Sequence, residues 1–130
     1  MTRYLTSWLV AAAAALLACG AFAAAPAPLS ESDKIDALIR AVETRTDLEF
    51  LRNNTAYSAR EAGRHLRTKL AFAGLRVKTA EDFIDRIATG SSMSGKPYLV
   101  RFLNGKQVTS AEFLRQELKR ISQAPAVSLK

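Results

Sequence analysis

The sequence predicts a small α+β domain of about four helices with two short antiparallel strand pairs. Apolar residues recur at helical spacing in four segments, and polar turn dipeptides separate short apolar runs that alternate as strands do. A chain of 130 residues has room for one domain. We expect this domain over residues 29–121, because a Pro/Ala tether (24–28) precedes it and an aperiodic, flexible tail (122–130) follows it.

The first helix is predicted to begin after Ser30, because Asp33 lies three residues further on and completes a short capping box. The buried stripe of this helix consists of Ile35, Leu38, Ile39 and Val42. The first strand pair follows as residues 48–52 and 55–57, joined by an Asn-Asn turn.

Two further helices are indicated by their end signals. Ser58 and Glu61 form a capping box at the start of the second helix, and Gly74 ends it. The third helix begins at Thr79, carries acidic residues in its first turn, and is expected to end at Gly90. The apolar stripes are Ala62, Leu66, Leu70 and Ala73 in the second helix, and Phe83, Ile84 and Ile87 in the third.

The remaining elements are a hairpin and a last helix. A polar loop (91–97) leads to strands at 98–103 and 106–108, which an Asn-Gly turn connects. Thr109 or Ser110 caps the last helix. Its apolar stripe consists of Leu114, Leu118 and Ile121.

Residues 1–23 are predicted to be a secretory signal peptide. The single basic residue Arg3 precedes a wholly apolar stretch, and an Ala-Phe-Ala tripeptide suits signal peptidase. The chain is therefore expected to be exported to a bacterial periplasm or envelope, with cleavage after Ala23. In the alternative, Cys19 ends a segment that resembles a bacterial lipobox. Residues 1–18 would then be removed and Cys19 would carry a lipid anchor.

Basic charge is the main surface feature of the sequence. The formal net charge is +7, and cleavage of the signal peptide leaves +6. Arg60, Arg64 and Arg67 recur on one helix and form a candidate anion-binding stripe. An anionic envelope component or an acidic protein would relieve the repulsion within this stripe, while the alternative is a solvated helix face. No nucleic-acid partner is expected, because the chain is exported and lacks interleaved aromatic residues.

Few residues in the sequence could serve as catalytic groups or metal ligands. One His and one Cys are too few for a zinc site, so we expect no metal and no cofactor. We expect His65 to be structural, because no spacing links it to a nucleophile and an orienting acid. Three acidic residues of the third helix are better explained as capping groups than as catalytic groups. The sequence therefore favours a protein that is not an enzyme and leaves the question open.

The loop between the third helix and the second hairpin is a candidate anion contact. Its hydroxyls, glycine amide and lysine suit a carboxylate or a phosphate, and the alternative is that they satisfy turn and helix-end backbone groups. The residues concerned are Ser91, Ser92, Ser94, Gly95 and Lys96. A nucleotide-binding loop is excluded, because Pro97 stands where that motif needs Ser or Thr and a helix precedes the loop.

Three motifs resemble those of a known family. They are Tyr-Ser-Ala-x-Glu-Ala-x-x-His-Leu-Arg-x-Lys-Leu from Tyr57, Ala-Glu-Asp-Phe-Ile from Ala80, and Ser-Ser-x-Ser-Gly-x-Pro-Tyr from Ser91. Together they resemble a family of small exported bacterial proteins that is catalogued only as a domain of unknown function, over residues 35–118. The resemblance implies export and a shared fold but no reaction.

The resemblance also implies two neighbourhoods in space. Members of that family often have cysteines where Leu48 and Phe102 stand here, so strands 48–52 and 98–103 are expected to be neighbours. The motifs group His65 with the loop from Ser91 to Lys96. We expect these residues to approach each other, and either to pin the loop or to frame a small anionic pocket.

Three functions remain open from the sequence. The first is an exported binding or interaction domain without enzymatic activity. The second is a peripheral or lipid-anchored envelope protein that binds anionic lipid through the arginine stripe. The third is a small serine hydrolase that uses Ser94 and His65.

Overall fold

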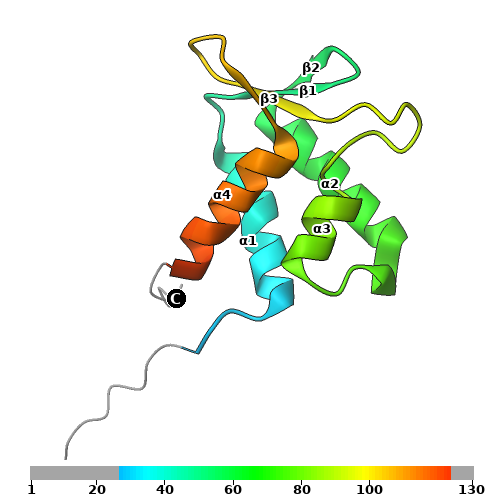
Figure 1. Cartoon of the computed structure of the whole chain (residues 1–130), viewed down its shortest axis with the longest axis vertical. Helices are drawn as coiled ribbons and strands as arrows, with labels where there is room; N and C mark the ends of the chain where they lie inside the picture. The colour runs from blue at the N-terminus through cyan, green and yellow to red at the C-terminus, as the bar shows by residue number, and fades with distance from the viewer. Residues whose placement is uncertain (1–26, 124–130) are drawn as a thin grey trace, which may run out of the picture.

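The computed structural model of the chain describes residues 27–123 (Figure 1). The predicted signal peptide, Cys19 and most of the predicted tether lie outside the described residues. Within the described part of the chain, no helix has the length and hydrophobicity that crossing a bilayer requires.

The predicted α+β class is confirmed. The helices are α1 (Glu31–Thr44), α2 (Ala59–Ala73), α3 (Ala80–Arg86) and α4 (Ser110–Gln123), with a short 3-10 helix η1 (Gly74–Arg76) after α2. The strands are β1 (Glu49–Arg52), β2 (Thr55–Tyr57), β3 (Leu99–Arg101) and β4 (Gln107–Thr109). The two predicted strand pairs join into a single antiparallel sheet in the order β2-β1-β3-β4.

The join between the two strand pairs is the pairing of β1 with β3. Glu49 lies opposite Arg101 in this antiparallel register, so the next step along it places Leu48 opposite Phe102. The expectation that these two strands are neighbours is confirmed. Leu48 is buried in the core, and Phe102 packs against the same core.

The helix starts follow the capping signals in the sequence. The Ser30 side chain accepts from the amide of Asp33, and Ser58 and Thr79 each form a complete capping box. Thr109 accepts from the amide of Glu112 at 3.1 Å, which makes it the cap of α4. Two helix ends differ from expectation: α3 stops at Arg86 rather than near Gly90, and α4 continues through Gln123.

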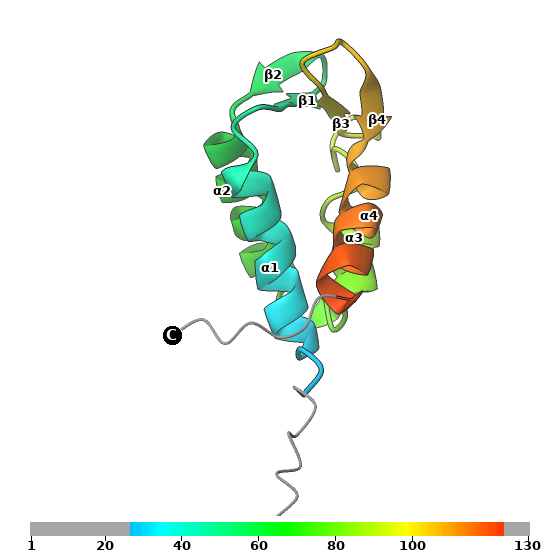
Figure 2. The ribbon, with the colours of Figure 1, turned by 90° about the vertical axis from the view of Figure 1, so that its left-hand side faces the viewer.

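The core lies between two pairs of helices and under the sheet. Figure 2 shows α1 and α2 on one side, α3 and α4 on the other, and the sheet across one end. The fully buried large side chains come from four elements and meet in this space. They are Leu38, Ile39, Val42, Phe83, Ile84, Val100 and Leu114. This arrangement leaves a space between α2 and the sheet, which is where the candidate site lies.

Candidate functional site

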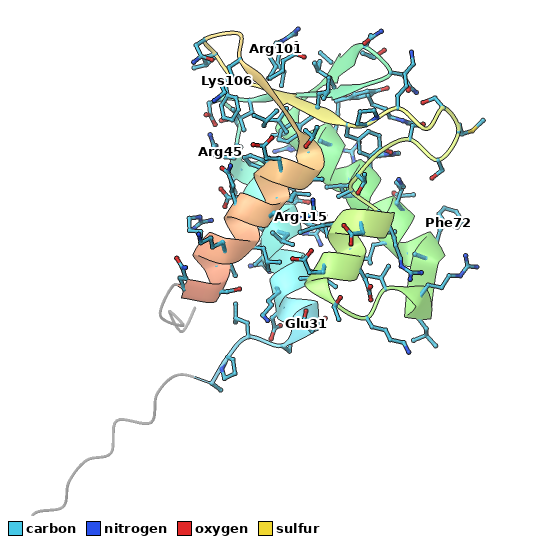
Figure 3. The ribbon with its side chains drawn as sticks, viewed as in Figure 1. Glu31, Arg45, Phe72, Arg101, Lys106 and Arg115 are labelled. Atoms are coloured by element: carbon cyan, nitrogen blue, oxygen red, sulfur yellow. The ribbon has the colours of Figure 1, made fainter. Side chains whose placement is uncertain are left out.

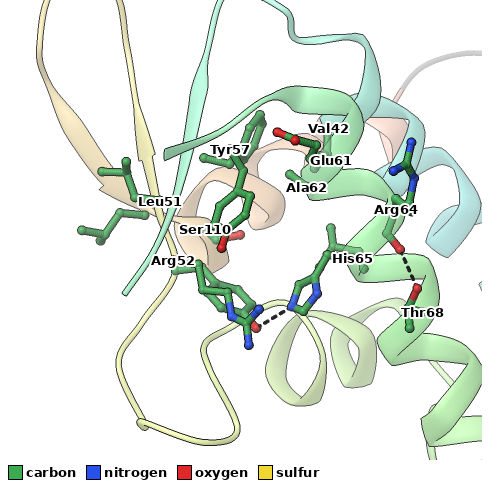
Figure 4. Close-up of a pocket in the computed structure, with 14 residues that line it drawn as sticks. Val42, Leu51, Arg52, Tyr57, Glu61, Ala62, Arg64, His65, Thr68 and Ser110 are labelled. Atoms are coloured by element: carbon green, nitrogen blue, oxygen red, sulfur yellow. Dashed lines mark hydrogen bonds between the residues drawn. The ribbon is translucent and has the colours of Figure 1, made fainter. Parts of the chain in front are cut away.

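A cavity of about 310 Å³ lies between α2 and the sheet (Figure 4). Apolar side chains from α1, β1 and α2 line its inner part, among them Val42, Phe50 and Leu66. Polar side chains also line it. They are Arg52, Tyr57, Glu61, Arg64, His65, Thr68, Tyr98 and Ser110. The exposed surface of this cavity is mostly apolar although several polar side chains line it, and apolar walls with polar groups among them are usual in small-molecule sites.

Arg52 is the most distinctive of these polar residues. It ends β1 two residues after the core residue Phe50, so strand alternation places both side chains on one face of the sheet. The Nε of Arg52 is buried and has no hydrogen-bond partner among the described residues. A buried guanidinium nitrogen without an acceptor is costly, so an anion that entered the cavity would find a donor already desolvated.

His65 approaches the same region from α2, and its partner is Tyr98. Its Nε2 lies 3.1 Å from the Tyr98 hydroxyl, and the two rings meet edge to face with centroids 5.9 Å apart. Figure 4 shows Arg52 and His65 approaching from opposite elements, β1 and α2. Arg52 and His65 therefore line the same cavity, although they belong to β1 and α2, which β2 separates in the sequence.

Lys69, which follows His65 by one turn of α2, also contacts Tyr98. Its ammonium group donates to the carbonyls of Ile87 and Gly90, at 2.8 and 3.0 Å, and to the Tyr98 hydroxyl at 3.2 Å. An ammonium group has three donors and no acceptor, so the Tyr98 oxygen accepts from Lys69. The phenolic proton is then free to point at Nε2 of a neutral His65, which accepts it in the tautomer that carries its own proton on Nδ1.

The pKa of His65 agrees with that assignment. Burial lowers the pKa below its ordinary value, and the nearby charges of Arg52 and Lys69 lower it further. His65 is therefore neutral at pH 7. The same charges that keep the imidazole neutral make the cavity attractive to an anion.

The serine loop has a different set of contacts. Ser91 is buried, and its amide and carbonyl close the loop through hydrogen bonds with Lys96 and Gly95. Ser94 donates to the side-chain oxygen of Asn53 at 2.6 Å. Ser92 is exposed. None of residues 91–96 is among those that line the cavity, while Lys69 fixes the start of the loop through Gly90.

The three residues of the arginine stripe have three different environments. Arg67 donates to Glu43 at 2.9 Å and to Asp36 at 3.1 Å, so two of the acidic residues of α1 already neutralise it. Arg64 lines the cavity, and Arg60 is exposed and outside the lining. The stripe is therefore divided between a helix–helix ion pair, the cavity and solvent.

The groups that a serine hydrolase or a metal site would need have other partners. No hydrogen bond joins Ser94 to His65 in residues 27–123, since each is bonded elsewhere. In the same part of the chain, no three His, Cys, Asp or Glu side chains gather in a way that could hold a metal ion.

Sequence reasoning missed Arg52, Lys69 and Tyr98. For two of them, the spacing in the sequence indicates which way the side chain points. Arg52 follows Phe50 at strand spacing, which predicts an inward side chain, and Lys69 follows His65 by four residues, which places both on one helix face. Tyr98 carries no such signal, because its contact with α2 depends on how the sheet is assembled.

The comparisons with known proteins give a family and one relative. Residues 29–122 match the model of a family of unknown function (DUF5329). A protein of Salmonella typhimurium (strain LT2), named "Uncharacterized protein YfeK", is 46% identical over 68 residues. That match covers 52% of this chain and 57% of the relative, so it spans little more than half of each. No solved structure matches the chain.

Proposed function

We propose that this chain, which belongs to the DUF5329 family of unknown function, is an exported binding domain whose ligand site is the cavity between α2 and the sheet. The observation that carries the proposal is the buried Nε of Arg52, which has no hydrogen-bond partner among residues 27–123 and belongs to a residue that lines the cavity. Export rests on the predicted signal peptide, residues 1–23.

The charges around the cavity favour an anionic ligand. Arg52 and Arg64 line it, and Lys69 lies 5.0 Å from the ring centre of the lining residue Tyr98, while Glu61 is the acidic residue of the lining. Glu61 already caps α2, where its carboxylate accepts from the amide of Ser58 at 2.9 Å. The ligand class that fits is therefore a small molecule with an apolar body and a single anionic head.

Binding has more support than catalysis. A hydrolase would need a serine within reach of an imidazole that can take its proton. Here His65 is hydrogen-bonded to Tyr98, and Ser94 donates to Asn53. The arginine-stripe alternative has less support than the cavity, because Arg67 is already paired with two acids of α1.

The proposal is tested by comparing a carboxylate with a neutral analogue of the same length. We expect decanoate to bind the mature chain in calorimetric titration and decanol to bind much more weakly. Arg52→Gln should weaken decanoate binding at least about tenfold, since a hydrogen bond to a charged group contributes about 1.5 to 3 kcal/mol. Arg60→Gln removes the same charge outside the cavity and should leave binding unchanged.

Two results would overturn the assignment of this site. Equal binding of decanoate and decanol would contradict the proposal that the ligand has an anionic head. Equal weakening by Arg52→Gln and Arg60→Gln would show a general charge effect instead of a site. Thermal unfolding of each variant checks that the fold is retained.

Export is tested separately by the mature N-terminus. Mass spectrometry of the protein from the cell envelope should show a chain that begins at Ala24, or a lipidated chain that begins at Cys19. Recovery of an intact Met1 from the cytoplasm would contradict export.

A further inference from the structure

Two large apolar side chains are almost fully exposed where α2 ends. Phe72 is 85% exposed and Leu75, in η1, is 93% exposed. Gly74 separates them with a φ of 54°, a left-handed conformation that turns the chain sharply out of the helix. Figure 3 shows Phe72 projecting away from the body of the molecule. Phe72 and Leu75 lie three residues apart, and exposed apolar groups that gather on a surface commonly mark an interaction site.

Free basic residues accompany this apolar pair. Arg76 and Lys78 are exposed, and neither has an ion-pair partner within residues 27–123. Residues 62–80 include five Lys or Arg and no Asp or Glu. The tip, defined as Phe72, Leu75, Arg76 and Lys78, therefore combines exposed apolar groups with two basic side chains that form no ion pair among the described residues, while the nearby carboxylates of Asp82 and Glu31 accept from backbone amides.

The tip lies at the end of the molecule where the chain enters α1. The carboxylate of Glu31, the first residue of α1, accepts from the amide of Ala80 at 2.8 Å, two residues after Lys78. Figure 1 shows this end opposite the sheet. The described chain therefore enters the domain at the tip end, two residues after Leu29.

We infer that the tip docks on the surface of an anionic lipid bilayer. Phe72 and Leu75 would enter the boundary between headgroups and acyl chains, while Arg76 and Lys78 would contact the anionic headgroups. This inference uses neither the cavity nor the arginine stripe, so it stands apart from the proposed function.

A second copy of the chain fits the tip less well than a bilayer does. A symmetric dimer would bring the positive charges of two tips together, because each copy presents the same patch. A stable interface also needs about 800 Å² from each partner, more than two side chains provide. A bilayer has no such minimum, and its headgroups supply the opposite charge.

The test is flotation of the mature chain from Ala24, without lipid, on vesicles of phosphatidylglycerol and phosphatidylcholine in equal parts. We expect binding to these vesicles, weak binding to phosphatidylcholine alone, and release at about 0.5 M salt. Phe72→Ser with Leu75→Ser should lower the partition coefficient at least about tenfold.

The matched control removes two equally exposed apolar residues elsewhere. Met93 and Leu103 are 91% and 88% exposed and belong to other loops. Met93→Ser with Leu103→Ser should change vesicle binding less than about twofold, since surface substitutions outside the contact have small effects. Circular dichroism of both double variants should match that of the parent chain.

Three results would overturn the inference. Equal loss in both double variants would show nonspecific apolar adsorption. Equal binding to neutral and anionic vesicles would remove the charge component. A tip variant that binds vesicles normally but dissociates a dimer in analytical ultracentrifugation would assign the tip to a second copy of the chain.

Discussion

The side chain of Lys69 donates hydrogen bonds to three acceptors. Its ammonium group satisfies two carbonyls that follow α3 and the hydroxyl of Tyr98, and it lies 5.0 Å from the centre of the Tyr98 ring. One side chain of α2 thus fixes both the start of the serine loop and the tyrosine that bonds to His65. The orientation of His65 follows from this chain of hydrogen bonds.

The neutral state of His65 predicts a pH dependence of stability. Its pKa in the folded chain lies below the ordinary value, which the unfolded chain retains. As the pH falls through about 6.5, the unfolded chain binds a proton that the folded chain resists, so the free energy of unfolding decreases. We expect urea unfolding to show lower stability at about pH 5.5 than at about pH 7.5.

His65→Gln is the control for this prediction. Glutamine keeps an acceptor for Tyr98 but does not titrate, and the chain has one histidine. The carboxylates whose pKa values are lowered, such as Glu61 and Asp82, lose their stabilising interactions only at more acidic pH. A variant that keeps the full decrease in stability between the two pH values would contradict the role of His65.

At the scale of elements, Gly63 determines how α1 and α2 approach each other. It is buried in the middle of α2, and a Cβ at this position would lie 2.2 Å from Cγ of Glu43. The same Glu43 receives the guanidinium of Arg67 in two hydrogen bonds. The glycine thus makes room for the side chain that neutralises one residue of the arginine stripe.

Gly63→Ala should therefore destabilise the fold although alanine is the better helix former. Displacing Glu43 is expected to cost about 1 to 3 kcal/mol, which exceeds the gain of about 1 kcal/mol in helix propensity. In a Glu43→Ala background the obstacle is gone, and Gly63→Ala should be neutral or stabilising. Chemical denaturation of the four proteins measures this cycle, and equal effects in both backgrounds would disprove the steric explanation.

The early end of α3 also has a cause at this scale. The Thr89 hydroxyl donates to the carbonyls of Ile84 and Asp85, at 2.5 and 3.1 Å, and Lys69 takes the carbonyl of Ile87. Side chains therefore supply donors that a further helical turn would have supplied. The glycine at position 90 could not predict this earlier end of α3, because Lys69 belongs to another helix.

At the scale of the whole molecule, the pairing of β1 with β3 joins two hairpins that are distant in sequence. Because Leu48 falls opposite Phe102, a Leu48→Cys, Phe102→Cys variant should form an intramolecular disulfide in an oxidising buffer. Mass spectrometry after thiol alkylation, on the chain from Ala24, measures the bond. The oxidised form should unfold at higher denaturant concentration than the reduced form, by about 2 to 4 kcal/mol in free energy.

A variant that stays reduced, or forms only intermolecular disulfides, would contradict the register. A Leu48→Cys single variant gives the control for the loss of the buried leucine.

Local signals predicted most of the elements but only part of the site. Capping boxes at Ser58 and Thr79 and the Asn-Gly turn depend on neighbouring residues, so they could be read from the chain. Arg64 and His65 were candidates from the sequence, and both line the cavity. Lys69 and Tyr98 were not, because their roles depend on contacts 29 and 33 residues apart.

The sequence by itself determined the α+β class, the helix starts and the excess of positive charge, because each depends on residues within a few positions of one another. Only the tertiary structure decided the register in which the two hairpins pair, that Arg67 is neutralised by α1, and that Arg52 lines a cavity. The reason is that burial and pairing are properties of surfaces that meet only when the chain is folded.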